Sequence, residues 1–274
     1  MQNRIALIGF GEAGSTFAQA AAWGACAMAY DIAPERVGAM AECGISRADS
    51  AAQALGGAQV VLSLVTADQA LFVAQSHAAS LAAGTLWCDM NSVAPETKRA
   101  AAAVIDAAGG IYVDVAVMAP VNPLRLDVPL FLSGPQASTG EKVLRELGFT
   151  SLRVVGDEIG RASTIKMLRS VMYKGLEALT AECLIACAKA GVTDEVLQSF
   201  GNDWSSGADY RLDRMMVHGT RRSAEMAEVV KTLEDLGVPA LMSRGTVQRQ
   251  ALVGALGIKT PPEGLDAKLE RLQA

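Results

Sequence analysis

Hydrophobic residues follow two different patterns in the two halves of the chain. In the first half, short apolar runs alternate with longer segments in which apolar positions recur every three or four residues. The short runs are typical of buried strands and the longer segments of amphipathic helices. The expected strands cover residues 4–8, 26–30, 59–65, 85–90, 111–117, 129–133 and 151–155, and the expected helices cover residues 15–23, 34–43, 50–55, 68–81, 95–108 and 136–147. This alternation predicts an α/β domain with a doubly wound, mainly parallel sheet and helices on both faces.

The second half contains only the helical pattern. Residues 160–190 carry apolar side chains at three- and four-residue steps without any proline. About 30 helical residues would extend roughly 45 Å, which is longer than one small domain needs. Further helices are expected at residues 193–200, 210–217, 223–236 and 240–255, followed by a loosely packed charged tail after two prolines at 261–262. The pattern predicts an α/β domain at residues 1–157 and an all-α domain at 158–274, joined by a long interdomain helix.

A glycine-rich turn lies between the first strand and the first helix. It consists of Gly9, Phe10, Gly11, Glu12, Ala13 and Gly14. In a dinucleotide fingerprint, the first glycine allows a tight turn, the second lets the backbone approach a pyrophosphate, and the third lets the helix pack against the strand. The free N–H groups at the start of the helix would then hold the phosphates. We therefore expect a Rossmann domain in which these six residues bind the cofactor, with a nucleotide-free strand-turn-helix as the alternative.

The second strand ends in Asp31, about 20 residues beyond the glycines, where a dinucleotide-binding domain has its ribose-binding carboxylate. A carboxylate at this position accepts hydrogen bonds from the adenosine ribose and repels a 2′-phosphate. The expected cofactor is NAD. Arg36 follows five residues later and leaves NADP possible.

Polar residues also follow two later strands, at the sheet edge where ligands bind in folds of this kind. These residues are Val65-Thr66 after one strand and Asn91-Ser92 after the next. Thr66 and Ser92 would equally serve as caps for the helices that follow them.

Composition restricts the class of protein. The 274 residues are 51% apolar and 19% charged, which favours a large core over disorder. The formal net charge is −5 and basic residues do not cluster, so neither nucleic acid nor an anionic membrane is an expected partner. No apolar run reaches the ~18 residues of a membrane span, and the N-terminal sequence does not have the pattern of a secretory leader. We expect a soluble cytoplasmic protein.

The cysteines do not form a recognisable framework. Their number, five, is odd, none has C-x-x-C spacing, and none has a histidine nearby. This pattern argues against disulfides and against zinc. Cys183 and Cys187 share a helix face, where packing as small apolar side chains is favoured over a metal clip. No metal is expected.

Four segments, in this order, resemble motifs of the β-hydroxyacid dehydrogenases, relatives of 6-phosphogluconate and 3-hydroxyisobutyrate dehydrogenase. They are IALIGFGEAG, DMNSVAPETKRAAA, DVAVMAPVNPLRLDVPLFLSG and GRASTIKMLRS. They are similar to the cofactor fingerprint, the segment that approaches the nicotinamide, the substrate loop and the catalytic lysine segment. A fifth segment, HGTRRSAEMAEVVKTLEDLGVP, is similar to a subgroup of phosphogluconate-dehydrogenase-like proteins of unassigned activity. The resemblance implies an NAD(P)-dependent dehydrogenase in which Lys166 is the general acid/base.

The chain departs from the family pattern where substrate is bound. The family's Ser-Gly-Gly is replaced by Met118-Ala119-Pro120, and its Asn-Asn after the lysine by Arg169-Ser170. These changes remove a hydroxyl and, at the proline, a backbone N–H. The resemblance still places the substrate contacts at Ser170, Arg169, Met118, Ala119 and Asn91, and places cofactor contacts at Val65, Thr66 and Ser92 in addition to the glycine turn and Asp31.

The expected reaction moves hydride between the cofactor and a small hydroxy acid or related polyol acid, while Lys166 takes or returns the hydroxyl proton. A lysine suits this role where burial and nearby cations lower its pKa from about 10.4 towards neutrality. Arg169 is three residues further on and would either lower the pKa of Lys166 or bind a substrate carboxylate by a bidentate contact. The expected partner is therefore a small carboxylate, although the sequence does not identify it.

Two alternatives to this function remain. One is imine reduction by a related fold, and the other is an NAD-binding sensor or scaffold without catalysis, which the altered substrate motifs favour. The apolar helical domain would expose large patches as a monomer, so we also expect a homodimer.

Overall fold

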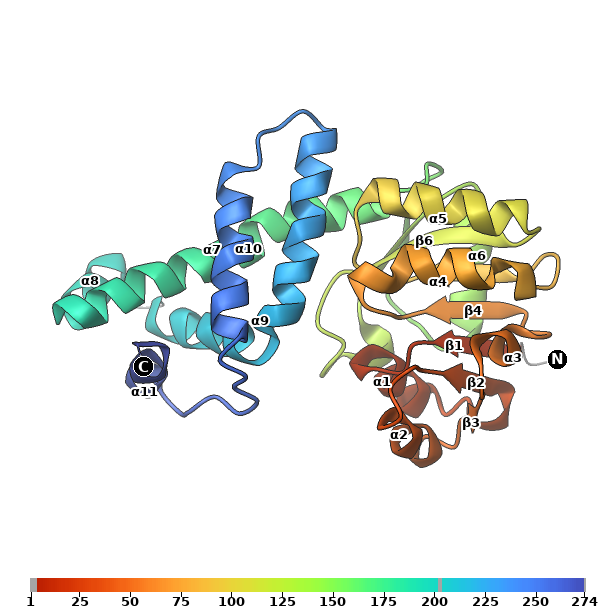
Figure 1. The fold of residues 1–274 in the computed structure, drawn as a ribbon, viewed down its shortest axis with the longest axis horizontal. Helices are drawn as coiled ribbons and strands as arrows, with labels where there is room; N and C mark the ends of the chain where they lie inside the picture. The colour runs from red at the N-terminus through yellow and green to blue at the C-terminus, as the bar shows by residue number, and fades with distance from the viewer. Residues whose placement is uncertain (1–3, 202–203, 274) are drawn as a thin grey trace. The chain divides into compact units, whose positions relative to one another are not determined.

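The computed structural model describes residues 4–201 and 204–273 (Figure 1). The chain divides into two compact units, Met1–Met167 and Leu168–Ala274. The division falls inside helix α7 (Arg161–Ala190). The domain boundary predicted after residue 157 lies ten residues earlier and remains a prediction.

The first unit is built on one eight-stranded sheet in the order β3-β2-β1-β4-β5-β6-β7-β8. All neighbouring strands are parallel except β6 and β7, which are antiparallel. The strands are β1 (Ile5–Ile8), β2 (Ala27–Tyr30), β3 (Ser46–Arg47), β4 (Val60–Ser63), β5 (Leu86–Asp89), β6 (Ile111–Val117), β7 (Leu130–Ser133) and β8 (Leu152–Gly156). The predicted doubly wound, mainly parallel sheet is confirmed.

Helices cover both faces of the sheet and form one apolar core on each (Figure 1). One face packs against α1 (Glu12–Ala21), α2 (Arg36–Glu42) and α6 (Ala137–Glu146). The other packs against α3 (Ala51–Leu55), α4 (Ala70–His77) and α5 (Pro95–Ala107). Short 3₁₀ turns lie at η1 (Gly24–Cys26), η2 (Ala67–Gln69), η3 (Ala78–Ser80) and η4 (Arg125–Asp127).

Each of the seven expected strands is present, with ends that differ by at most two residues. The pattern missed β3, because two exposed residues carry no apolar signal. The helix expected over residues 68–81 is α4 flanked by η2 and η3.

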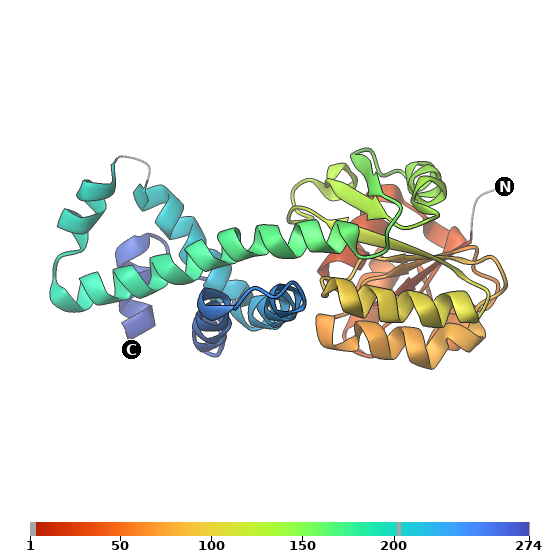
Figure 2. The same ribbon diagram turned by 90° about the horizontal axis from the view of Figure 1, so that it is seen from above.

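The second unit contains the helices α8 (Thr193–Phe200), α9 (Trp204–Asp235), α10 (Leu241–Gly254) and α11 (Leu265–Gln273), together with most of α7. Its core includes Leu184 of α7, Met215 and Met216 of α9 and Leu269 of α11. The second half of α9 and α10 run side by side in Figure 1 and are seen nearly end-on in Figure 2.

Two expectations for the second unit are wrong. The helices expected at residues 210–217 and 223–236 are one continuous helix, α9, which includes Gly219. A glycine inside a helix costs only about 1 kcal/mol, and here it permits close packing, since an added Cβ would lie 2.6 Å from the Gln250 carbonyl oxygen.

The tail is also ordered rather than loosely packed, because it forms α11. Leu269 is buried in the core, and Lys268 Nζ lies 2.6 Å from Asp209 and 2.8 Å from Asp213. Among the helices of the described residues, none combines the length and the apolar character needed to cross a membrane.

Candidate active site

The glycine turn lies at the carboxyl edge of the sheet, between β1 and α1. Gly9 has a φ of +93°, and an added Cβ would lie 2.5 Å from the Leu64 carbonyl oxygen. A Cβ on Gly14 would lie 2.9 Å from the Gly9 carbonyl oxygen, so close strand–helix packing requires this glycine. A Cβ on Gly11 would meet nothing within 4 Å. Protein packing therefore does not explain Gly11, whereas a pyrophosphate approaching the backbone does.

The start of α1 is suited to an anion. Its N-cap is Gly11, which offers no side chain to cap the helix. The first N–H groups of a helix lack intrahelical partners and attract negative charge. Together with the glycine turn, these groups fit the phosphates of a dinucleotide, and Phe10, Glu12 and Ala13 lie where the sequence places them in that loop.

Asp31 directly follows β2, and both of its carboxylate oxygens are held by the backbone. Its Oδ2 accepts a hydrogen bond from Phe10 N at 2.6 Å, and Oδ1 accepts one from Ala33 N at 2.9 Å. Each carboxylate oxygen can accept a second bond, so ribose hydroxyls fit here. A pocket of about 220 Å³ adjoins the carboxylate and is lined by Tyr30, Asp31, Ile32, Pro34, Val37, Met40, Arg47, Ala48 and Asp49.

Asn91 connects the ends of neighbouring strands. Its side-chain oxygen accepts a hydrogen bond from Val65 N at 2.7 Å, and its Nδ2 donates to Ser63 Oγ at 2.9 Å. The side chain is buried, and these bonds fix the loop that carries Val65 and Thr66. Thr66 is at the N-cap position of η2, but its side chain makes no capping hydrogen bond, and the N-cap of α5 is Ala94 rather than Ser92, so the alternative capping roles of Thr66 and Ser92 are wrong. A side-chain hydrogen bond from Gln69, followed by one from Thr66, lowers the pKa of Asp68. The ligand roles predicted for Asn91, Val65 and Thr66 remain predictions.

Lys166 and Ser92 meet although they are 74 residues apart in the sequence. Lys166 Nζ donates a hydrogen bond to Ser92 Oγ at 2.6 Å. Ser92 lies between β5 and α5, and Lys166 lies in the second turn of α7. The predicted catalytic lysine is therefore at the carboxyl end of β5, where the sequence placed a cofactor contact.

The loop after β6 carries Met118 and Ala119. The Met118 side chain is buried in a small apolar cluster with Ala116 and Ala162, and Ile165 packs against this cluster. Met118 thus lies against the first turns of α7, next to the residue that precedes Lys166. Where the family has a serine, this chain has an apolar contact with the helix.

Arg169 and Ser170 belong to the second unit. The Arg169 guanidinium lies 4.0 Å from the centre of the Tyr173 ring, and Ser170 is buried with Lys174 Nζ at 3.5 Å from its hydroxyl oxygen. Lys174 also lies 2.7 Å from Glu225, yet burial outweighs that carboxylate and lowers the pKa of Lys174. The sequence analysis did not identify this buried lysine.

The sequence analysis also missed a buried ionic group behind the strand ends, which we name the Lys98 cluster: Lys98, Asp89, Asp114 and Tyr112. Tyr112 donates its hydroxyl proton to Asp89 at 2.6 Å, and burial, followed by Asp89 and Asp114, raises the pKa of Tyr112 well above its ordinary value. A signal was present in the sequence, because Lys98 shares a helix face with the apolar residues Ala101, Ala102 and Ile105.

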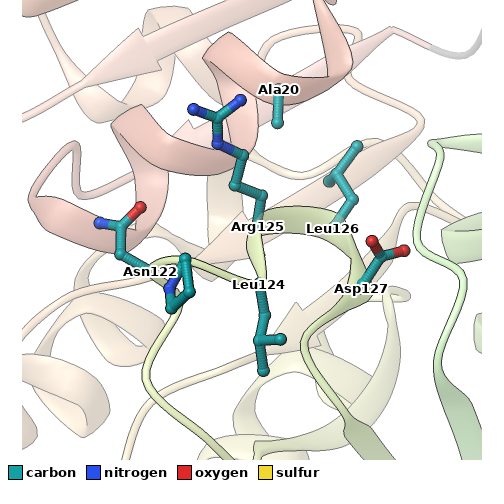
Figure 3. Close-up of a pocket in the computed structure, with 7 residues that line it drawn as sticks. Ala20, Asn122, Leu124, Arg125, Leu126 and Asp127 are labelled. Atoms are coloured by element: carbon teal, nitrogen blue, oxygen red, sulfur yellow. The ribbon is translucent and has the colours of Figure 1, made fainter.

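A separate pocket of about 500 Å³ lies between α1 and the loop that contains η4 (Figure 3). It is lined by Ala20, Asn122, Pro123, Leu124, Arg125, Leu126 and Asp127. The Arg125 side chain extends towards α1 in Figure 3. None of the predicted site residues lines this pocket.

Comparisons with known proteins agree with this architecture. Residues 4–139 match the model of the NAD binding domain of 6-phosphogluconate dehydrogenase, and residues 188–253 match a domain of unknown function, DUF1932. A conserved hypothetical protein from Sinorhizobium meliloti 1021 has a solved structure with 38% identity and a TM-score of 0.74, covering 100% of this chain and 96% of that one.

A 3-hydroxyisobutyrate dehydrogenase from Pseudomonas aeruginosa is 31% identical over 188 residues, which are 64% of this chain and 62% of that protein. Two solved enzymes share the fold alone. The 3-hydroxyisobutyrate dehydrogenase of Mycobacterium tuberculosis has 17% identity and a TM-score of 0.75, covering 100% of both chains. An imine reductase from Streptomyces aurantiacus has 21% identity and a TM-score of 0.57, covering 98% of this chain and 99% of that one.

Proposed function

Because the chain belongs to the β-hydroxyacid dehydrogenase family, with an NAD-binding domain like that of 6-phosphogluconate dehydrogenase, we propose that it is an NAD(P)-dependent oxidoreductase acting on a small hydroxy acid or related polyol acid. The observation that carries this proposal is the 2.6 Å hydrogen bond between Lys166 Nζ and Ser92 Oγ. The bond supports the proposal because Ser92 belongs to a loop that we propose to bind the cofactor. When bound, the nicotinamide accepts or supplies the hydride.

Lys166 is the general acid/base in this proposal. As a neutral amine, it takes the proton from the substrate hydroxyl during oxidation; as an ammonium, it returns that proton during reduction. The hydroxyl oxygen of Ser92 accepts a hydrogen bond from one N–H of the lysine. This bond restricts the directions in which the remaining N–H groups or the lone pair of Nζ can point. Ser170 and Arg169 are proposed to contact the substrate carboxylate, with Met118, Ala119 and Asn91 near the reacting end.

A panel of small hydroxy acids with NAD and NADP, followed through the absorbance of the reduced cofactor, tests the activity. With an active substrate, Lys166→Ala should lower kcat on the order of 10²- to 10⁴-fold, the usual contribution of a general acid/base. Affinity for the reduced cofactor should be unchanged. Lys142→Ala is the matched control, because Lys142 is exposed on α6.

Retained turnover in Lys166→Ala would remove the lysine from the mechanism. Cofactor binding without turnover of any hydroxy acid would instead support an NAD-binding sensor without catalysis.

Imine reduction is the second enzymatic candidate, since an imine reductase shares the fold. Turnover of cyclic imines but not of hydroxy acids would favour it.

We also propose that the protein forms a homodimer through the second unit. Several large apolar side chains there are more than half exposed, including Leu241 at 77%, Met242 at 74% and Met172 at 71%. An interface through this unit would remove these side chains from water.

A further inference from the structure

Lys98 is completely buried although lysine is among the residues least often found inside proteins. Its Nζ donates hydrogen bonds to the Asp89 side chain at 2.9 Å and to the Asp89 backbone oxygen at 2.6 Å. It also lies 3.4 Å from Asp114 Oδ1, an ion pair rather than a direct hydrogen bond. One ammonium thus joins two carboxylates that belong to neighbouring strands, β5 and β6.

Stability alone is a weak explanation for this arrangement. Removing charges from water is costly, and well-packed apolar residues commonly replace a buried ionic group without loss of stability. What an ionic group adds is fixed direction, because each oxygen and each N–H must meet its partner at a defined position. The groups that the two carboxylates bind therefore indicate the function of the Lys98 cluster.

Asp89 holds the segment that carries Ser92. Its Oδ1 accepts a hydrogen bond from Asn91 N at 2.9 Å, and its Oδ2 accepts the Tyr112 hydroxyl at 2.6 Å. Asn91 in turn binds the end of β4 and the loop after it, through Ser63 and Val65. The backbone that leads into Ser92 is thereby fixed.

Asp114 holds the start of α7. Its Oδ2 accepts a hydrogen bond from Ser163 N at 3.0 Å and another from Ser133 Oγ at 3.1 Å. Ser133 Oγ accepts Ala162 N at 2.9 Å. Two backbone N–H groups in the first turn of α7, which lack intrahelical partners, are capped from the sheet. Lys166 is three residues beyond Ser163, and one turn further along the helix.

We infer that Lys98 is a positioning residue that holds Ser92 and Lys166 in register by fastening Asp89 to Asp114. Because Lys98 is fully buried, we expect it to act through Asp89 and Asp114 rather than directly on substrate or cofactor. The inference rests on the proposed role of Lys166. Its observable consequence is a change in the environment of the Lys166 amine when Lys98 is removed, in a protein whose fold is intact.

The experiment measures how fast Lys166 reacts with limiting acetic anhydride at fixed pH, by peptide mass spectrometry. Ser92→Ala is the reference variant for this labelling, because it removes the hydroxyl that accepts the hydrogen bond from Lys166. Loss of one hydrogen bond corresponds to a change of about two- to tenfold in an equilibrium, so we expect the labelling of Lys166 to change by that factor in Ser92→Ala. Lys98→Met should change it in the same direction by a comparable factor.

A second buried lysine provides the matched control. Lys268 in α11 is also held between two aspartates, Asp209 and Asp213. Lys268→Met should lower the thermal unfolding midpoint and leave Lys166 labelling at the wild-type rate. Equal effects of Lys98→Met and Lys268→Met on labelling would overturn the inference, because general loosening would then explain both.

If Lys98→Met does not fold, the double change Lys98→Met with Asp114→Asn removes the excess charge and keeps an oxygen to cap α7. Wild-type labelling of Lys166 in either folded variant would refute a positioning role. The labelling needs no substrate, so its outcome is separate from that of the proposed function. With a substrate in hand, kcat should fall in Lys98→Met.

Discussion

At the scale of single residues, Asp31 in the proposed cofactor site has a side chain that is fixed by hydrogen bonds to the backbone. Asp31 is oriented by the N–H groups of Phe10 and Ala33, so its carboxylate needs no rearrangement to accept ribose hydroxyls. Arg47 lines the same pocket and its side chain is more than half exposed, with Asp49 as a 4.0 Å partner. At this site, the Asp31 carboxylate would repel a 2′-phosphate, whereas the Arg47 guanidinium would attract it.

Asp31→Asn should shift the cofactor preference from NAD towards NADP. A neutral amide loses the charge-assisted bonds to the ribose and no longer repels the phosphate, which corresponds to about tenfold weaker NADH binding. Titrations followed by cofactor fluorescence would measure both dissociation constants. Arg47→Ala is the companion variant and should weaken NADPH alone. An unchanged ratio of the two constants in Asp31→Asn would mean that the carboxylate does not contact the ribose.

At the scale of elements, backbone contact between α9 and α10 organises part of the second unit. Gly219 and Gly254 face each other, and a Cβ on Gly254 would lie 2.2 Å from Thr220 N and 2.6 Å from the Gly219 carbonyl carbon. These are backbone atoms, which cannot move aside as a flexible side chain can. The two glycines are therefore requirements of packing, even though each lowers intrinsic helix propensity.

Gly254→Ala should destabilise the protein by about 1–3 kcal/mol, the usual cost of overpacking, because the helices must separate. Gly245→Ala in the same helix is the control, since its Cβ would meet nothing within 4 Å. Gly245→Ala should stabilise by about 0.5–1 kcal/mol through helix propensity. Urea unfolding of both variants measures the difference, and equal stabilities would contradict the close crossing.

At the scale of the whole molecule, the second unit presents apolar side chains along one stripe of α7. Leu168, Met172 and Leu179 are spaced by four and seven residues and are 40%, 71% and 54% exposed. A spacing of this kind puts the side chains on one helix face. This face is the part of the proposed homodimer contact that the sequence pattern and the exposure both support.

The double variant Met172→Glu with Leu179→Glu should convert a dimer into monomers, because it buries two charges in the contact. Sedimentation velocity would give the mass at several concentrations. We expect the wild-type protein at twice the mass of one chain and the variant at one. If the wild-type protein is a monomer at all concentrations, the proposed dimer is wrong. If the variant is still a dimer, the contact lies on another face.

Much of the fold is determined by the sequence alone. Short apolar runs and segments with a 3.6-residue apolar period give the order of strands and helices, because the central strands are buried on both faces whereas the helices bury one face. The glycine turn followed by Asp31 identifies the NAD-binding domain, because few residues other than glycine allow the turn and the approach of a pyrophosphate. The lysine segment was recognisable from its resemblance to a family.

Only the tertiary structure brings Lys166 to Ser92 and joins Lys98 to both Asp89 and Asp114, because these contacts connect different strands and helices. The spacing of apolar residues also did not predict that α9 is one continuous helix. Gly219 resembles a helix end in the sequence, and it becomes a helix interior because α10 packs against it. Local spacing specifies which elements form, whereas close packing between them decides which polar side chains face each other.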